Sequence, residues 1–330
     1  MKATYYLRLA LRRRDIALQL LKQLPRRVVR ISKERGVTRG IGYLLYYLQH
    51  YSGLPFDKLY WLIVKLIVGG KVVKTRVLDF DMYVDLDDHG ISRQLWIEGI
   101  REHGAVSAYK KELLHLQEVL GAPLTILEAG SNIGYYTLMA YYTLKEVRIF
   151  AVEPASDNVQ LLLQNIKLNG IEGKVDVTQG ALSERTGKMR LFLSDQSNVH
   201  SMEYSRSSRD YIDVPTWSID DFLQRKGLEP KDVHVLRMDT EGHELSILLG
   251  AKRLLMSSTP LLCFIEFHDV LVKNGRIYKM ISLLKEHGFR VSYGCVDYFT
   301  GTIEEFWSLD DLPNILQRHS AAEVFLRRGF

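Results

Sequence analysis

The feature that most constrains this chain is a glycine turn between two apolar segments, I-L-E-A-G-S-N-I-G at residues 126–134. Residues 124–127 predict a short strand that enters the turn, and residues 147–152 predict a second strand that ends at Glu153. Glycines at 130 and 134 let the backbone approach a ligand closely, and Glu153 can accept hydrogen bonds from two ribose hydroxyls. The segment therefore predicts a nucleoside-binding βαβ unit.

The spacing of these glycines separates two classes of cofactor. A dinucleotide fold uses G-x-G-x-x-G and points a helix N-terminus at a pyrophosphate, whereas this chain has Asn132 where the second glycine would stand. Glu128 places a carboxylate at the end of the first strand, where it would repel phosphate and favour a cationic or amine-bearing ligand. S-adenosylmethionine fits this pattern and NAD does not, so an NAD-dependent oxidoreductase is the less favoured alternative.

A second segment supports the same interpretation. Residues 233–238 predict another apolar strand, which runs into D-T-E-G-H-E at residues 239–244. Together with the first motif, the segment L-R-M-D-T-E-G-H-E-L resembles the FkbM family of S-adenosylmethionine-dependent methyltransferases, whose members carry D-x-E-G-x-E at this place. The likeness also covers N-I-K-L-N-G at 165–170, A-L-S at 181–183 and E-F-H at 266–268, and it spans roughly three fifths of the chain.

The resemblance implies an α/β fold built on a seven-stranded, Rossmann-like class I methyltransferase sheet. Strands that alternate with helices along the chain predict a mostly parallel sheet. The resemblance implies that the C-terminal strand, near residues 323–328, is antiparallel. We expect a basic, mainly helical N-terminal region at 1–70 and a β-hairpin with lead-in helices at 71–122. The methyltransferase domain would occupy 123–330, with its FkbM-like core at about 126–295.

Two local patterns predict structure around this core. Apolar and mostly acidic side chains alternate over residues 78–87, which predicts a half-buried strand paired with residues 72–77. Ser156 is expected to cap the helix that follows Glu153. The buried face of that helix is expected to carry Val159, Leu162, Leu163 and Ile166.

A long polar connection, residues 194–209, lies between two predicted strands at 188–193 and 211–214. Loops of this length in compact domains are usually functional or disordered. If the loop crosses the carboxyl edge of the sheet, it could close over an acceptor, with Asn198, His200 and Ser201 as candidate contacts. A surface loop without a role is the alternative.

By resemblance, the cofactor S-adenosyl-L-methionine would contact the ends of the first three strands. The glycine turn is expected to surround its methionine part, Glu153 to accept from the ribose hydroxyls, and the end of the third strand to bracket adenine. The predicted cofactor-binding residues are Glu128, Gly130, Ser131, Asn132, Gly134, Glu153, Gln179, Gly180 and Ala181. Asn165 is instead expected to brace the end of its helix.

The predicted catalytic residues are Asp239, Glu241, Glu266 and His268. Asp239 and Glu241 are two residues apart, as are Glu266 and His268, so each pair would project from the same face of its strand if the strand continued. The resemblance implies that the fourth and fifth strands are neighbours, which would bring the two pairs together. A hydroxyl is a poor nucleophile until its proton is accepted, and this cluster supplies general bases. A divalent cation such as Mg²⁺ is the less favoured alternative, and no metal ligand is assigned. For His268 a structural role stays equally open.

The resemblance implies O-methylation of a sugar or other hydroxyl acceptor in glycan, glycolipid or secondary-metabolite biosynthesis. No Pro-Pro turn of the kind found in enzymes that methylate exocyclic base amines follows the fourth strand, and neither Cys263 nor Cys295 lies in a Pro-Cys context. A specific nucleic-acid partner is therefore not expected. The alternative is a catalytically silent S-adenosylmethionine-binding scaffold of a biosynthetic complex, which the intact motif carboxylates oppose.

Charge is distributed unevenly along the chain. Residues 1–40 hold twelve Lys or Arg and two Asp or Glu, so the net charge of +5 for all 330 residues arises from this arm. Such an arm could contact an anionic membrane, or it could dock on the mildly acidic body of the enzyme. The two cysteines form no disulfide framework, no apolar run reaches membrane-spanning length, and arginines interrupt the N-terminal apolar stretch. We therefore expect a cytoplasmic enzyme, with peripheral membrane contact as an added possibility.

Overall fold

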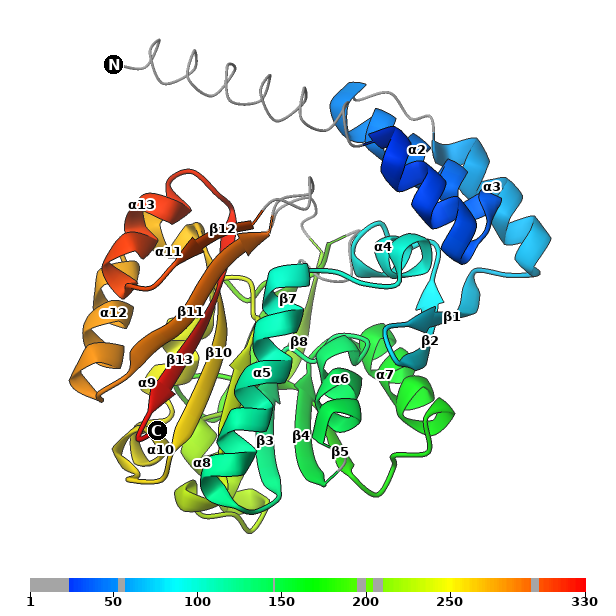
Figure 1. Cartoon of the computed structure of the whole chain (residues 1–330). Coiled ribbons are helices and arrows are strands. Elements are labelled where there is room, and N and C mark those ends of the chain that lie inside the picture. Colours follow the sequence, from blue (N-terminus) through cyan, green and yellow to red (C-terminus); the bar gives the residue numbers. More distant parts are fainter. Residues whose placement is uncertain (1–23, 53–56, 145, 195–199, 204–209, 298–302) are drawn as a thin grey trace.

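The computed structural model of the chain describes residues 24–330 except 53–56, 145, 195–199, 204–209 and 298–302. Its centre is an eight-stranded mixed sheet with the strand order β12-β11-β13-β10-β9-β3-β4-β5 (Figure 1). The strands are β3 (Leu124–Ala129), β4 (Val147–Glu153), β5 (Val175–Gln179), β9 (Val235–Met238), β10 (Leu261–His268), β11 (Arg290–Asp297), β12 (Ile303–Phe306) and β13 (Ala321–Arg328).

The class I methyltransferase fold is confirmed, with one correction to the strand count. From β5 to β10 all neighbours pair in parallel, and β13 pairs antiparallel with both β10 and β11, as the sequence predicts for the C-terminal strand. The prediction of seven strands is wrong by one, because β12 adds an eighth strand, antiparallel to β11, at the sheet edge. This strand has four residues, of which only Phe306 is buried, so its sequence pattern is too short to predict a strand.

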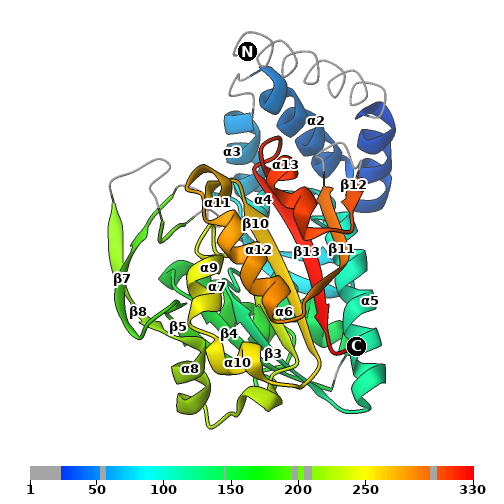
Figure 2. The same ribbon diagram turned by 90° about the vertical axis from the view of Figure 1, so that its left-hand side faces the viewer.

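Two hydrophobic cores form on the two faces of the sheet because successive strand residues point to opposite sides. Ile126 belongs to one core and its neighbour Leu127 to the other. The first core is covered by α5 (His103–Leu120), α6 (Tyr135–Leu144) and α7 (Ser156–Leu168). The second is covered by α8 (Ile219–Arg225), α9 (Glu244–Leu249), α10 (Lys252–Met256), α11 (Val270–Lys273), α12 (Ile277–Glu286) and α13 (Leu312–Leu316), several of which face the viewer in Figure 2. Short 3₁₀ turns lie at Pro230–Asp232 and Leu309–Asp311.

The N-terminal part is helical where it is described. Residues 24–35 form a helix, followed by α2 (Val37–Ser52) and α3 (Asp57–Val68), which pack as a group beside the hairpin of β1 (Val72–Val77) and β2 (Phe80–Asp85) and helix α4 (Ile91–Glu98) (Figure 1). The predicted hairpin is thus confirmed. Residues 1–23, most of the basic arm, lie outside the described residues, so membrane contact through the arm stays a prediction. In the part of the chain that is described, no helix combines the length and apolarity needed to cross a bilayer.

A second, three-stranded sheet follows β5. It consists of β6 (Ala181–Leu182), β7 (Gly187–Phe192) and β8 (Tyr211–Trp217) in the order β6-β8-β7. The predicted connection between β7 and β8 is described only at Ser194 and residues 200–203, so Asn198 lies outside the described residues. His200 accepts a hydrogen bond from the Ser194 backbone N–H, and the Ser201 hydroxyl donates to the Glu241 carbonyl. This loop therefore reaches the segment that carries the second motif.

Helix α7 departs from its predicted start and face. Its N-cap is Ala155 rather than Ser156, and the carboxylate of Glu153 accepts from the Ala155 backbone N–H in place of a serine cap. Leu163 is 49% exposed, whereas Leu161 is buried. Val159, Leu162 and Ile166 are buried as predicted, and Leu161 takes the place expected for Leu163.

Asn165 of α7 joins three parts of the fold. Its amide oxygen accepts from the Tyr83 backbone N–H at 2.6 Å, and its amide nitrogen donates to the carbonyls of Tyr83 and Ile133 at 3.1 and 2.8 Å. The side chain is fully buried. It therefore fixes the hairpin strand β2 and the glycine turn to the same helix, a wider role than the expected bracing of the helix end.

Replacing this residue should cost stability. Asn165→Ala leaves buried backbone groups of Tyr83 and Ile133 without partners, and we expect the free energy of unfolding to fall by about 2–3 kcal/mol in urea denaturation. The exposed Asn314→Ala variant is the matched control and should unfold like the wild type. Equal stability of the two variants would show that Asn165 does not hold these segments together.

Candidate functional site

The glycine turn leaves β3 and enters α6 through left-handed backbone conformations. Gly130, Asn132 and Gly134 have φ angles of 80°, 49° and 91°. A Cβ added to Gly130 would collide with the Asp239 carbonyl oxygen, and one added to Gly134 would lie 2.6 Å from a Leu162 methyl. The turn therefore needs glycine at both positions for its close packing against Asp239, which follows β9, and against α7. The close approach of a ligand to these glycines stays a prediction.

Glu153 organises the turn from the end of β4. Its carboxylate accepts from the Asn132 backbone N–H at 2.8 Å, from the Ala155 N–H at 3.1 Å and from the Asn158 side chain at 3.1 Å. Burial raises the pKa of Glu153 to about 7, although these hydrogen bonds lower it. A carboxylate offers about four acceptor positions, so at least one remains for a ribose hydroxyl.

A cavity, here called the donor cavity, lies where this turn meets the end of β9. Among its lining residues are four of the predicted cofactor contacts, Gly130, Asn132, Glu153 and Ala181, and two of the predicted catalytic residues, Asp239 and Glu241. The loop after β7 adds His200 and Met202. The structure therefore brings the two motifs to one cavity.

Five predicted cofactor contacts lie away from the lining of the donor cavity. Glu128 and Ser131 are buried beneath the turn, and Gly134 packs on Leu162. Gln179 is exposed, and Gly180 is held against Trp217 and the Pro215 carbonyl. These residues shape the walls around the cavity and do not form its surface.

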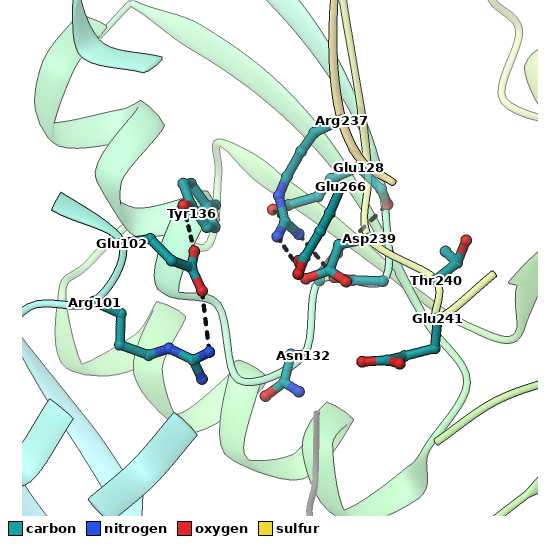
Figure 3. A network of polar contacts seen from close by, with 12 residues as sticks. Arg101, Glu102, Glu128, Asn132, Tyr136, Arg237, Asp239, Thr240, Glu241 and Glu266 are labelled. Atoms are coloured by element: carbon teal, nitrogen blue, oxygen red, sulfur yellow. Dashed lines mark hydrogen bonds and ion pairs between the residues drawn. The ribbon is translucent and has the colours of Figure 1, made fainter. Parts of the chain in front are cut away.

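Arg237 of β9 is the largest feature that the sequence analysis missed. Its guanidinium donates to the Gly130 carbonyl at 2.9 Å, to Glu128 at 3.3 Å and to Asp239 at 3.0 Å (Figure 3). It also stacks 4.3 Å from the Tyr136 ring centroid. Glu128, which we expected to serve a cationic ligand, therefore already has a cation from the protein. The available signal was an arginine near the end of a mainly apolar predicted strand, directly before the second motif.

The four predicted catalytic residues converge because β9 and β10 are parallel neighbours. His268 Nε2 lies 3.6 Å from Glu241 Oε1, 3.7 Å from Glu266 Oε1 and 4.0 Å from Asp239 Oδ1. Its other ring nitrogen, Nδ1, lies 3.1 Å from Oε1 of the fully buried Glu244. Asp239, Glu266 and His268 offer three ligand atoms within 4.8 Å of one another.

Burial and neighbouring charges oppose each other in this cluster. Burial lowers the pKa of His268, but Glu241 and Glu244 raise it and leave it well above its usual range. Burial, with a further contribution from Asp239, raises the pKa of Glu266 well above its usual range. The cluster therefore holds excess negative charge that needs a proton or a cation.

A second cavity of about 320 Å³, here called the acceptor cavity, opens on the other side of Glu266. Its charged lining residues include Glu98, Arg101, Glu102, Glu266, Asp297 and Glu323. Glu102 has a left-handed φ of 50°, accepts from the Tyr136 hydroxyl at 2.7 Å and pairs with Arg101 at 3.0 Å (Figure 3). Arg101 and Glu102 were not predicted from the sequence as part of a site. The available signal was Gly99, which ends α4 in a left-handed conformation just before them.

The parallel central strands and the glycine turn at their carboxyl edge define a class I methyltransferase. Residues 128–291 match the methyltransferase FkbM domain, and the chain belongs to the FkbM methyltransferase family. It is therefore an S-adenosylmethionine-dependent methyltransferase, and S-adenosylmethionine is its methyl donor. No curated protein sequence matches the chain.

Solved methyltransferase structures give weaker likenesses. The precorrin-6y C5,15-methyltransferase of Geobacter metallireducens is 14% identical, with 69% of this chain and 89% of that chain covered and a TM-score of 0.38. M. jannaschii TYW2 in complex with AdoMet is 11% identical, with 78% and 87% covered and a TM-score of 0.39. An SAM-dependent methyltransferase from Agrobacterium tumefaciens is 11% identical, with 78% and 70% covered and a TM-score of 0.41. Scores this low carry no information about the acceptor.

The position of Glu153 predicts a loss of donor affinity on mutation. Glu153→Ala removes the ribose acceptor and the anchor of the Asn132 N–H, so calorimetry should show S-adenosylmethionine binding about 10- to 100-fold more weakly. The matched control is Glu146→Ala, because that side chain is 73% exposed and pairs with Lys174 at the surface. Unchanged affinity in Glu153→Ala would remove this residue from the donor site.

The raised pKa of Glu153 also predicts a pH dependence of stability. Between its ordinary value of 4.5 and about 7, the folded protein binds a proton that the unfolded chain lacks. The contribution of this group is complete below pH 4.5 and is lost as the pH rises through 7. From pH 5.5 to 8, donor-free wild type should lose about 2 kcal/mol relative to Glu153→Gln in urea denaturation. Parallel pH profiles of the two proteins would contradict this assignment.

Proposed function

We propose that this methyltransferase transfers the methyl group to a hydroxyl oxygen of a sugar or another polyhydroxylated acceptor. The observation that carries the proposal is the position of the carboxylate–histidine cluster between two cavities. Asp239 and Glu241 line the donor cavity, and Glu266 lines the acceptor cavity. A small cavity that includes Asn132, Asp239 and Glu266 in its lining lies between them.

The acceptor cavity favours a ligand that donates hydrogen bonds. Its walls carry the carboxylates of Glu98, Glu102, Asp297 and Glu323 as well as Glu266. Carboxylates accept hydrogen bonds from hydroxyl groups and repel anions, so a sugar hydroxyl suits this end better than a phosphate. Arg101, one of the cations that line the cavity, pairs with Glu102.

The reaction needs a group that accepts a proton and an in-line approach. As the acceptor oxygen bonds to the methyl carbon, the carbon–sulfur bond of the donor breaks and the hydroxyl proton leaves. We assign the proton to Asp239, which lines the donor cavity and is held in place by Arg237 at 3.0 Å. The other charged side chains around the reacting oxygen are Glu241, Glu266 and His268.

The proposed acceptor class can be tested directly. The enzyme is incubated with methyl-labelled S-adenosylmethionine and a panel of neutral sugars, amino sugars and sugar phosphates, and products are located by mass spectrometry. We expect label on a hydroxyl oxygen of a neutral or amino sugar. Label found on nitrogen or carbon would overturn the O-methylation proposal.

Charge removal at Asp239 tests the assigned base. Asp239→Asn keeps the shape of the side chain and should lower turnover about 100-fold or more, with a modest change in donor affinity. The exposed Asp213→Asn on β8 is the matched control and should retain wild-type turnover. If Asp239→Asn is fully active while Glu266→Gln is inactive, the base belongs to β10.

A further inference from the structure

We propose that Asp239, Glu266 and His268 bind a divalent transition-metal cation, of which Mn²⁺ is the most practical probe. Their ligand atoms lie within 4.8 Å of one another at the junction of the donor and acceptor cavities. From the sequence, a cation here is the less favoured alternative. The arrangement around His268 reverses that preference.

The first argument is the spacing around His268 Nε2. This side chain is 2% exposed, and the nitrogen faces carboxylate oxygens of Glu241, Glu266 and Asp239 at 3.6, 3.7 and 4.0 Å. Hydrogen bonds between nitrogen and oxygen span about 2.7–3.2 Å, so each of these separations is too long for one. Two ligands about 2.1 Å from a shared ion lie roughly 3–4 Å apart. The distances from Nε2 to Glu266 and to Asp239 have this spacing.

The second argument is the orientation of the imidazole. Nδ1 of His268 faces Oε1 of Glu244 at 3.1 Å, and the same oxygen accepts from the backbone N–H groups of Thr240 and Gly242. This carboxylate favours a hydrogen on Nδ1, so Nε2 is the ring nitrogen that faces the acidic side chains. Their negative charge calls for a positive charge at Nε2, which either a proton on the nitrogen or a metal ion bound to it can supply. Metal-binding histidines are commonly oriented by a carboxylate in this way.

The donor set indicates the class of ion. One imidazole with two carboxylates suits Mn²⁺, Fe²⁺ or Zn²⁺ better than Mg²⁺, which prefers oxygen ligands alone. Three protein ligands leave coordination positions for a hydroxyl and water, and the partly exposed Asp239 and Glu266 side chains border the two cavities. In the proposed O-methylation, the ion would lower the pKa of the acceptor hydroxyl, and this role rests on that proposal. Binding of the ion itself does not depend on that role.

Metal binding is measured on the full-length protein, freed of metal by chelator and without donor or acceptor. Titration with MnCl₂, followed by calorimetry and by loss of the free Mn²⁺ paramagnetic resonance signal, should show one site. Glu266→Gln and Asp239→Asn should each weaken binding at least 10-fold, since each removes one ligand charge. Glu305→Gln, an exposed carboxylate on β12, is the matched control and should bind like the wild type.

The outcome separates this site from the proposed reaction. Circular dichroism checks that each variant is folded, and His268→Gln provides a third ligand variant if one of the others unfolds. Wild type that binds neither Mn²⁺ nor Zn²⁺ stoichiometrically, or ligand variants that bind as the control does, would overturn the metal site. Either result leaves the O-methylation proposal standing, and a failure of the sugar panel leaves a measured metal site standing.

Discussion

The buried guanidinium of Arg237 is the interaction on which the site depends. It joins the end of β3 through Glu128, the glycine turn through the Gly130 carbonyl, and the start of the second motif through Asp239. Each partner comes from a different segment, so one side chain aligns the glycine turn with the carboxylate–histidine cluster. Removing one member of a buried charged network leaves the others unpaired at high cost, and the three segments are therefore fixed as a unit.

The same network explains how so many acids are tolerated near one another. Glu128 and Asp239 share the positive charge of Arg237, whereas Glu241, Glu244 and Glu266 surround His268. Cross-strand pairing places Glu323 directly opposite Glu266, and like charges in that position destabilise a sheet. Natural folds keep such conflicts mainly at functional sites. Here the repulsion between Glu266 and Glu323 lies at the edge of the sheet where the two cavities meet.

The sequence was most informative where local pattern alone determines structure. The apolar strand at residues 124–127 and the carboxylate of Glu153 at the end of the next strand follow from local pattern, and the antiparallel strand near 323–328 follows from the family resemblance. Arg237 and Glu102 could not be assigned from pattern, because their roles arise from partners far along the chain. The packing constraint on Gly130 could not be assigned from pattern either, because the Asp239 carbonyl that it contacts follows a strand far along the chain.

The left-handed turn at Arg101 and Glu102 has a consequence for how such an enzyme can diversify. These residues wall the acceptor cavity yet precede the region that matches the family domain, whereas the donor cavity is built within it. Changes in the lead-in segment can therefore alter the shape and charge of one wall of the acceptor cavity without touching the glycine turn. Glu266, on another wall of the same cavity, lies within the family domain, so the lead-in segment can vary in sequence while that carboxylate is kept.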